Sequence, residues 1–195
     1  ISPRGPGATA CLGTAITRTV IVNPTAQVND PANQIVCNGN PTTAVNFGTV
    51  NTGGTTTYGW TNSNVTIGLA ASGTGNIASF TATNAGTAPI TGTITVTPTY
   101  SNGGVNCTGP VQTFALSVNP SAQVNDPADQ VVCNGSPTSA VTFTTNRTGG
   151  TTTYAWTNNN TSIGLAASGT GNIAAFTAVN TGTAPVTATI TVTPT

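Results

Sequence analysis

The chain has 195 residues, and only six of them are charged: three arginines and three aspartates. Without a basic patch, neither a nucleic acid nor an anionic membrane surface is an expected partner, and no membrane insertion is expected in this segment. Because histidine, glutamate and lysine are all absent, general acid–base catalysis lacks its usual groups. We therefore expect no enzyme activity, no catalytic residues and no cofactor.

A repeat of 96 residues organises the chain. Residues 25–99 recur as 121–195 without a gap, and 57 of the 75 positions are identical. A period this long indicates that each copy is one folding unit of a tandem array. We predict the last strand of a preceding unit at 1–24, a complete unit at 25–120 (unit 1), and a unit without its last strand at 121–195 (unit 2).

Alternating apolar and polar residues predict short strands throughout unit 1, with no helix. The clearest case is residues 90–97, where Ile90, Ile94 and Val96 alternate with threonines. Residues 72–75, Ser-Gly-Thr-Gly, read as a turn. The strands expected in chain order are 34–37, 43–47, 55–60, 65–69, 77–82, 90–97 and 112–118. Short strands separated by turns predict an all-β fold of tandem Ig-like β-sandwiches.

Two proline-containing linkers, 23–31 and 119–127, precede the two units. Proline restricts its own backbone and that of the residue before it, so we expect stiff joints that turn the units into beads on a rod. Asn29-Asp30 and Asn125-Asp126 offer oxygen ligands to calcium. Calcium sites generally combine several carboxylates, whereas Asp-Pro also favours turns, so we predict no metal site.

Aromatic residues on the third strand of each unit are expected in the core. Trp60 and Trp156 recur at the same position of the repeat, with a tyrosine two residues before each. A tryptophan on the third strand of a sandwich usually fills the space between the sheets. The alternative is a platform for stacking on sugars. The predicted core aromatics are Trp60, Trp156, Tyr58, Tyr154, Phe47 and Phe114.

Several motifs resemble a known family. Val-Cys-Asn-Gly at 36–39, Tyr-Gly-Trp-Thr-Asn at 58–62, the glycine-rich segment 67–76 and Ile-Thr-Val-Thr-Pro at 94–98 are similar to PKD-like, Ig-like repeats in large secreted surface proteins of gliding bacteria. The resemblance implies extracellular stalks, adhesins and filaments. It predicts a structural or adhesive protein at the cell surface. A carbohydrate- or ice-binding module on the same scaffold is the alternative, with surface glycans as possible ligands.

Four cysteines without a Cys-x-x-Cys pair or histidine favour disulfides over zinc, and hence an oxidising compartment outside the cell. We expect Cys37 to bridge Cys107 within unit 1, which would close a long loop. The same register would join Cys11 to Cys133 of a neighbouring copy. The rival pairing is Cys11 with Cys37 and Cys107 with Cys133, each across a linker.

Unit 2 is expected to expose an unpaired strand edge, because it lacks a counterpart of residues 112–118. Residues 12–24 are a divergent copy of that strand, with Ile16, Val20 and Val22 on one alternating face. Arg18 departs from the pattern, because Phe114 stands at its place in unit 1. Either the chain is part of one long polypeptide, or separate copies join head to tail by strand addition. In both cases the predicted partner is another copy of this repeat.

Overall fold

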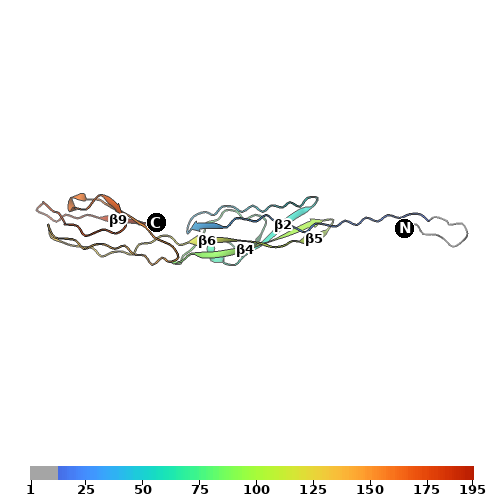
Figure 1. The fold of residues 1–195 in the computed structure, drawn as a ribbon, viewed down its shortest axis with the longest axis horizontal. Helices are drawn as coiled ribbons and strands as arrows, with labels where there is room; N and C mark the ends of the chain where they lie inside the picture. Colours follow the sequence, from blue (N-terminus) through green and yellow to red (C-terminus); the bar gives the residue numbers. More distant parts are fainter. Residues whose placement is uncertain (1–12) are drawn as a thin grey trace.

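The computed structural model describes residues 13–195 and shows an elongated all-β protein (Figure 1). Two sheets follow one another along the long axis, and the N-terminal segment extends from the first. The predicted all-β fold is confirmed, since the helical elements among the described residues are two single-turn 3₁₀ helices. In chain order the elements are β1 (Gln34–Cys37), β2 (Thr55–Asn62), η1 (Val65–Ile67), β3 (Ser72–Thr74), β4 (Ile90–Asn102), β5 (Val105–Thr108), β6 (Gln112–Asn119), β7 (Tyr154–Asn158), η2 (Thr161–Ile163), β8 (Ser168–Thr170) and β9 (Ile190–Pro194).

The strands of unit 1 form one mixed sheet in the order β1-β6-β4-β2-β3, and β5 pairs with the far part of β4. β1 runs parallel to β6, whereas the other neighbours are antiparallel. The central strand β4 buries Ile94, Val96 and Tyr100 on one face, and the threonines between them lie on the more accessible face. The alternation of apolar and polar residues in the sequence therefore determines which face of β4 covers the core.

Residues 41–47 and 77–82 bring Val45, Phe47, Ile77 and Ala82 against the inner face of the sheet. We expected two regular strands here, and that prediction is wrong: the segments pair only through the isolated bridges Pro41↔Thr81 and Val45↔Ile77. Side chains take the other backbone donors. The Phe47 N–H donates to Asn76 Oδ1 (2.9 Å), and the Phe80 N–H donates to Thr42 Oγ1 (3.1 Å). Such side-chain bonds replace a continuous ladder.

Three local predictions also need correction. Residues 65–69 are not a strand, because Asn64 caps the helix η1 by accepting the Thr66 N–H, and Gly68 ends it at φ 94°. Residues 72–75 are not only a turn, because β3 pairs with β2. β5 was not expected. Gly103 and Gly104, with φ of 60° and 77°, make the tight turn that folds it back onto β4.

The pairings of unit 1 recur in unit 2 at the same repeat positions. Trp60 faces Val96 across β2 and β4, and Trp156 faces Val192 across β7 and β9. The bridges Pro137↔Thr177 and Val141↔Ile173 repeat those of unit 1. The identical residues of the repeat thus adopt the same local structure twice.

Direct hydrogen bonds hold the two units end to end. From unit 1, the side-chain amide of Asn38 donates to the Ser121 hydroxyl of unit 2 (3.0 Å). From unit 2, Arg147 Nη1 donates to the Gly86 carbonyl (2.6 Å), and the Thr148 N–H donates to the carbonyl of the next residue, Thr87 (2.9 Å). These contacts restrict bending at the joint.

Replacing Gly73 with alanine should lower the free energy of unfolding by about 1–3 kcal/mol. A Cβ at Gly73 would lie 2.2 Å from Cζ2 of Trp60, and the buried indole has little room to move away. Gly59→Ala is the matched control, because a Cβ there meets nothing within 4 Å and unit 2 carries Ala155 at that position. Urea unfolding of the full chain, followed by tryptophan fluorescence, measures both. Equal stability of the two variants would contradict the close packing of Gly73 on the indole.

Candidate functional site

The tryptophans predicted for the core lie on the inner side of the two units. Trp60 and Trp156 are only 8% and 7% exposed, so neither indole has an open face on which a sugar ring could stack. The tyrosines are partly buried, and each has its ring centroid 5.5 Å from that of a core phenylalanine. The structure places the predicted core aromatics as follows: Trp60, Trp156, Phe47 and Phe114 are buried, and Tyr58 and Tyr154 are half-buried.

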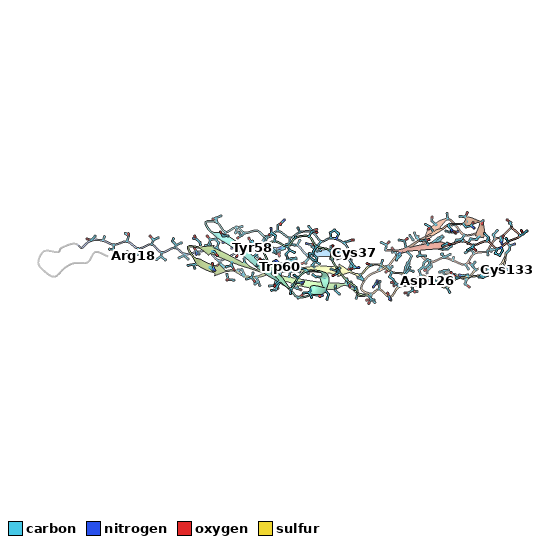
Figure 2. The ribbon with its side chains drawn as sticks, turned by 180° about the vertical axis from the view of Figure 1, so that it is seen from behind. Arg18, Cys37, Tyr58, Trp60, Asp126 and Cys133 are labelled. Atoms are coloured by element: carbon cyan, nitrogen blue, oxygen red, sulfur yellow. The ribbon has the colours of Figure 1, made fainter. Side chains whose placement is uncertain are left out.

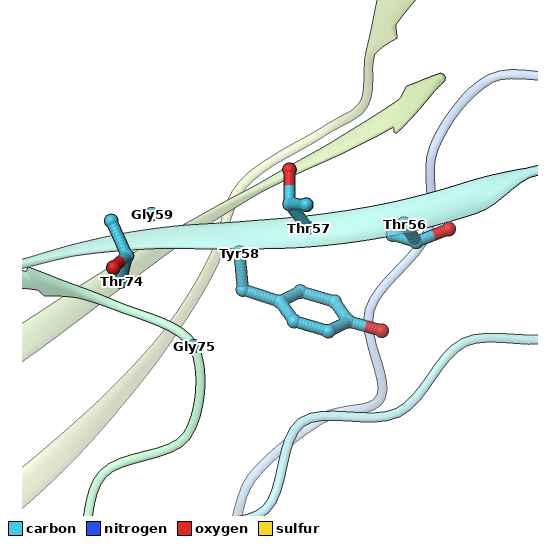
Figure 3. A pocket seen from close by; sticks show the side chains of 6 residues that line it. All are labelled: Thr56, Thr57, Tyr58, Gly59, Thr74 and Gly75. Carbon is cyan, nitrogen blue, oxygen red and sulfur yellow. The ribbon is translucent and has the colours of Figure 1, made fainter. Parts of the chain in front are cut away.

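Two surface depressions lie on unit 1. One lies beside Tyr58 and is lined by Thr56, Thr57, Gly59, Thr74 and Gly75, without a charged side chain (Figure 3). The other surrounds Asp30, whose neighbour Asn29 already accepts the Gly48 N–H through Oδ1 (2.7 Å). One carboxylate is too few for a calcium site of the usual kind. Within residues 13–195, no three His, Cys, Asp or Glu side chains are grouped to hold a metal.

Strand β6 completes both the sheet and the core of unit 1. It pairs with β4 along one edge, from Ile90↔Val118 to Val96↔Gln112, and with β1 along the other. Its inward residues Phe114, Leu116 and Val118 are 3%, 2% and 0% exposed. Residues 121–195 hold no counterpart of this strand.

The sheet of unit 2 therefore ends at β9. One edge of β9 pairs with β7, and the other edge pairs with no strand of the described chain. Residues 130–133, the counterpart of β1, form no strand either. The reason is that β1 pairs with β6 alone, and its counterpart has no such neighbour. Val132 is 41% exposed, whereas its counterpart Val36 packs against the core of unit 1.

The core of unit 2 is open on the same side. Ile190 and Val192 are half-buried, although their counterparts Ile94 and Val96 are both 0% exposed. The buried cluster of unit 2 consists of Phe143, Trp156 and Ile173, compared with twelve residues in unit 1. The side of the sheet that β6 covers in unit 1 thus leaves apolar groups accessible in unit 2, which is the usual mark of an interaction site.

The segment 13–24 has a β6-like sequence but pairs with no strand within residues 13–195. The three predicted donor residues Ile16, Val20 and Val22 are 77%, 85% and 87% exposed. Arg18 lies on extended chain beyond the end of unit 1 (Figure 2), and its Nη1 donates to the carbonyl of Thr17 (3.1 Å). The segment reaches unit 1 only at its end, where the side-chain amide of Asn23 donates to the Asn102 carbonyl and that of Asn102 donates to Asn23 Oδ1 (both 3.0 Å). Residues 13–22 are exposed and do not fold back onto unit 1 of their own chain.

Cys37 and Cys107 lie at opposite ends of unit 1. Cys37 is in register with Asn119, just past the Val118↔Ile90 pair, whereas Cys107 is in register with Tyr100. The intervening length of β4 spans about 30 Å at the usual rise per residue, but a disulfide needs Cα atoms within about 7 Å. The predicted Cys37–Cys107 bridge is therefore wrong. Cys37, Cys107 and Cys133 are free thiols in this structure.

Of the other predicted cysteine pairs, two involve Cys11, which lies outside the described residues. Its predicted bridge to Cys133 of another copy used the same register as the pair just excluded, and its rival pairing with Cys37 stays a prediction. The rival pair Cys107–Cys133 also fails. Cys133 lies at the far end of unit 2, beyond the joint near Cys37 (Figure 2), while Cys107 belongs to β5 near the N-terminal end of unit 1 (Figure 1).

The stability of the chain should stay constant from about pH 5 to 8, because no histidine is present to titrate in that range. Burial raises the pKa of Tyr58 above its ordinary value of 10.0, and a hydrogen bond with Thr49 partly offsets the rise. Because the pKa of Tyr58 is higher in the folded chain than in the unfolded chain, it contributes stability that is fully present below the pKa of the unfolded state. This stabilisation is lost as the pH rises through the pKa of the folded state. Melting temperatures should therefore fall only above about pH 10, and Tyr58→Phe should reduce that fall. A shift of many degrees between pH 5 and 8 would contradict the expectation.

Comparison with protein-family models and with curated proteins finds no match for this chain. Over residues 13–195, no helix is long and apolar enough to cross a membrane. The features of the described chain that point to a function are the open edge of β9 and the exposed strand-like segment 13–24.

Proposed function

We propose that this chain is an extracellular structural protein whose PKD-like, Ig-like β-sandwich units assemble head to tail into a thin filament. In this proposal, residues 12–24 of one copy add a strand to the open edge of β9 in unit 2 of another copy. The single observation that carries it is the free edge of β9 next to an incompletely buried core. The same chain displays the strand that fits this edge.

The register of the added strand follows from the repeat. Val20 takes the place of Leu116, and Val22 takes the place of Val118. In unit 1, Leu116 lies opposite Gly92, where a Cβ would come within 2.6 Å of Ile67 Cδ1. In unit 2 that position is Ala188. A larger residue just before β9 (alanine in place of glycine) thus meets a smaller residue on the added strand (valine in place of leucine), and the volume of the pair is nearly unchanged.

The position of the two surfaces favours a filament over a closed ring or dimer. The segment 13–24 extends from one end of the elongated molecule, and unit 2 lies at the other end (Figure 1). A contact between two different surfaces at opposite ends is heterologous, and it propagates unless rotation closes it. One long polypeptide containing the same units would give the same series of domains.

The proposed location outside the cell is supported by the resemblance of residues 67–76 and 94–98 to repeats of secreted surface proteins. The outward face of β4 is consistent with it, because its hydration depends on threonine hydroxyls rather than on charges. Such a surface responds little to pH or salt.

Negative-stain electron microscopy of the purified full chain at increasing concentration tests the proposal. We expect unbranched filaments one unit wide, and sedimentation should show the filament fraction rising with concentration. A chain that stays monomeric at every concentration would overturn the assembly. If that monomer instead bound members of a glycan array, the carbohydrate-binding alternative would replace the filament.

A further inference from the structure

We infer that Arg18 of one copy forms an ion pair with Asp129 of the copy it docks on, and that this pair fixes the register of the added strand. The inference rests on the proposed strand addition and names its specificity-determining residues. The docking strand and unit 2 depart in charge from their counterparts in unit 1 at three positions, and Arg18 and Asp129 are two of them. The third, Arg147 in place of Asn51, bonds the Gly86 carbonyl at the joint.

The first departure lies at the edge beside β6. In unit 1 the Ala115 N–H donates to Asn33 Oδ1 at 2.7 Å, just before β1 begins. The counterpart of Asn33 in unit 2 is Asp129, and the counterpart of Ala115 on the docking strand is Thr19. The Asp129 carboxylate can therefore accept the Thr19 N–H where Asn33 accepts that of Ala115. A hydrogen bond to a carboxylate is stronger than one to an amide oxygen.

The second departure lies one residue away on the strand. Arg18 stands at the position of Phe114, whose ring is 3% exposed in unit 1. An arginine buried there without a partner would be strongly unfavourable. Because β1 begins only at Gln34, the edge beside this position is bordered by the short segment that holds Asn33, or Asp129 in unit 2. The long Arg18 side chain can reach this edge and meet the carboxylate.

Because the chain has only six charged residues, the occurrence of two opposite charges at neighbouring positions supports an ion pair. Three of the charges are Arg147, which bonds the Gly86 carbonyl at the joint, and Asp30 and Asp126, which recur at the same repeat position. Among residues 13–195, Arg18 and Asp129 are the remaining pair of opposite charges. Each replaces an uncharged residue of unit 1, and in the proposed register the two replacements fall at neighbouring positions.

The ion pair between Arg18 and Asp129 would favour one register of the added strand among those that the apolar pattern alone permits. A slip by two residues keeps the same face of the strand inward, so alternation by itself does not prevent it. Such a slip would place Arg18 at the position of Leu116, which is 2% exposed, away from Asp129. A slip by two residues the other way would place Arg18 at the half-buried position of Gln112, also away from Asp129. Of these three registers, only the one set by the repeat brings Arg18 next to Asp129.

A double-mutant cycle on filament assembly tests the pair in the full chain. Arg18→Gln and Asp129→Asn should each raise the concentration needed for assembly by about threefold to tenfold, and the double variant should be no worse than either single one. Asp126→Asn is the matched control, because Asp126 is a nearby carboxylate that has a counterpart in unit 1. The exchange Arg18→Asp with Asp129→Arg should restore assembly in part, because it restores the pair of opposite charges but an arginine at 129 cannot accept the Thr19 N–H.

The salt dependence of filament assembly supplies a second measurement. It would not depend on Asp129 if Arg18 and Asp129 had only structural roles. Rising sodium chloride should weaken assembly of the wild-type chain and leave the Asp129→Asn variant nearly unaffected. Independent, additive effects of the two substitutions would overturn the ion pair while leaving strand addition intact, provided that the wild-type chain forms filaments. A wild-type chain that forms none would overturn the pair together with the proposed function.

Discussion

Replacing both Val20 and Val22 with aspartate should abolish filament formation by the full chain. In the proposed register these residues take the places of Leu116 and Val118, which are 2% and 0% exposed in unit 1. Two carboxylates would then be buried without partners, at a cost of several kcal/mol each. Electron microscopy and sedimentation at concentrations well above the wild-type threshold measure the effect.

The control substitution lies on the same strand and adds the same charge. Ile21→Asp changes the residue that corresponds to Ser117, whose hydroxyl lies 2.8 Å from that of Thr91 on the exposed face of the sheet. This variant should still assemble. Val20 and Val22 are exposed in the free chain, so their replacement should leave monomer stability unchanged. Filaments formed by the Val20/Val22 variant would show that this face of the segment does not enter unit 2.

Alternation and repetition were sufficient to predict the all-β fold and the strands with the strongest period. Residues 90–97 and 112–118 lie within β4 and β6, because their apolar side chains recur every second position and face one core. Residues 34–37 form β1, in which Val36 faces the core and Ile35 is exposed. The open edge of unit 2 could be anticipated for the same reason. The repeat defines a complete unit, and residues 121–195 lack its last strand.

Other features depend on interactions that alternation does not encode. Residues 65–69 alternate like a strand, but the Asn64 cap and the positive φ of Gly68 close a 3₁₀ turn instead. Residues 43–47 lose a regular ladder because Asn76 and Thr42 side chains take backbone donors. The cysteine register was missed because β1 runs parallel to β6. Its last residue therefore lies at the end of the unit farthest from β5.

The proposed docking site likewise combines features that the sequence predicts with a feature that only the structure shows. The positions of Val20 and Val22 follow from alignment with β6, whereas the meaning of Arg18 does not. On sequence alone, Arg18 is a cation where a buried phenylalanine belongs. The hydrogen bond from Ala115 to Asn33 is what identifies Asp129 as a neighbour of the docked strand. That contact joins residues far apart in the chain, and no local pattern marks it.

Trp60→Ala should lower the free energy of unfolding of unit 1 by about 3–5 kcal/mol, and Trp156→Ala should cost unit 2 clearly less in the dilute monomer. Both indoles are equally buried, but Trp60 packs in a closed core and Trp156 in an open one. Where the surroundings are already accessible, removing a large side chain leaves less of an enclosed cavity. Calorimetry below the assembly concentration, with each transition assigned by its variant, measures both effects.

Strand addition should reduce this difference, which makes the comparison a test of the open core as well as of the tryptophans. In filaments Val20 and Val22 of the added strand cover part of the open core, so Trp156→Ala should become more destabilising than it is in the dilute monomer. Trp60→Phe is the control for the indole N–H: Nε1 of Trp60 has no hydrogen-bond partner among the described residues, so this change should cost less than alanine. If the dilute monomer lost as much stability from Trp156→Ala as from Trp60→Ala, the core of unit 2 would already be closed. An added strand would then have nothing to complete.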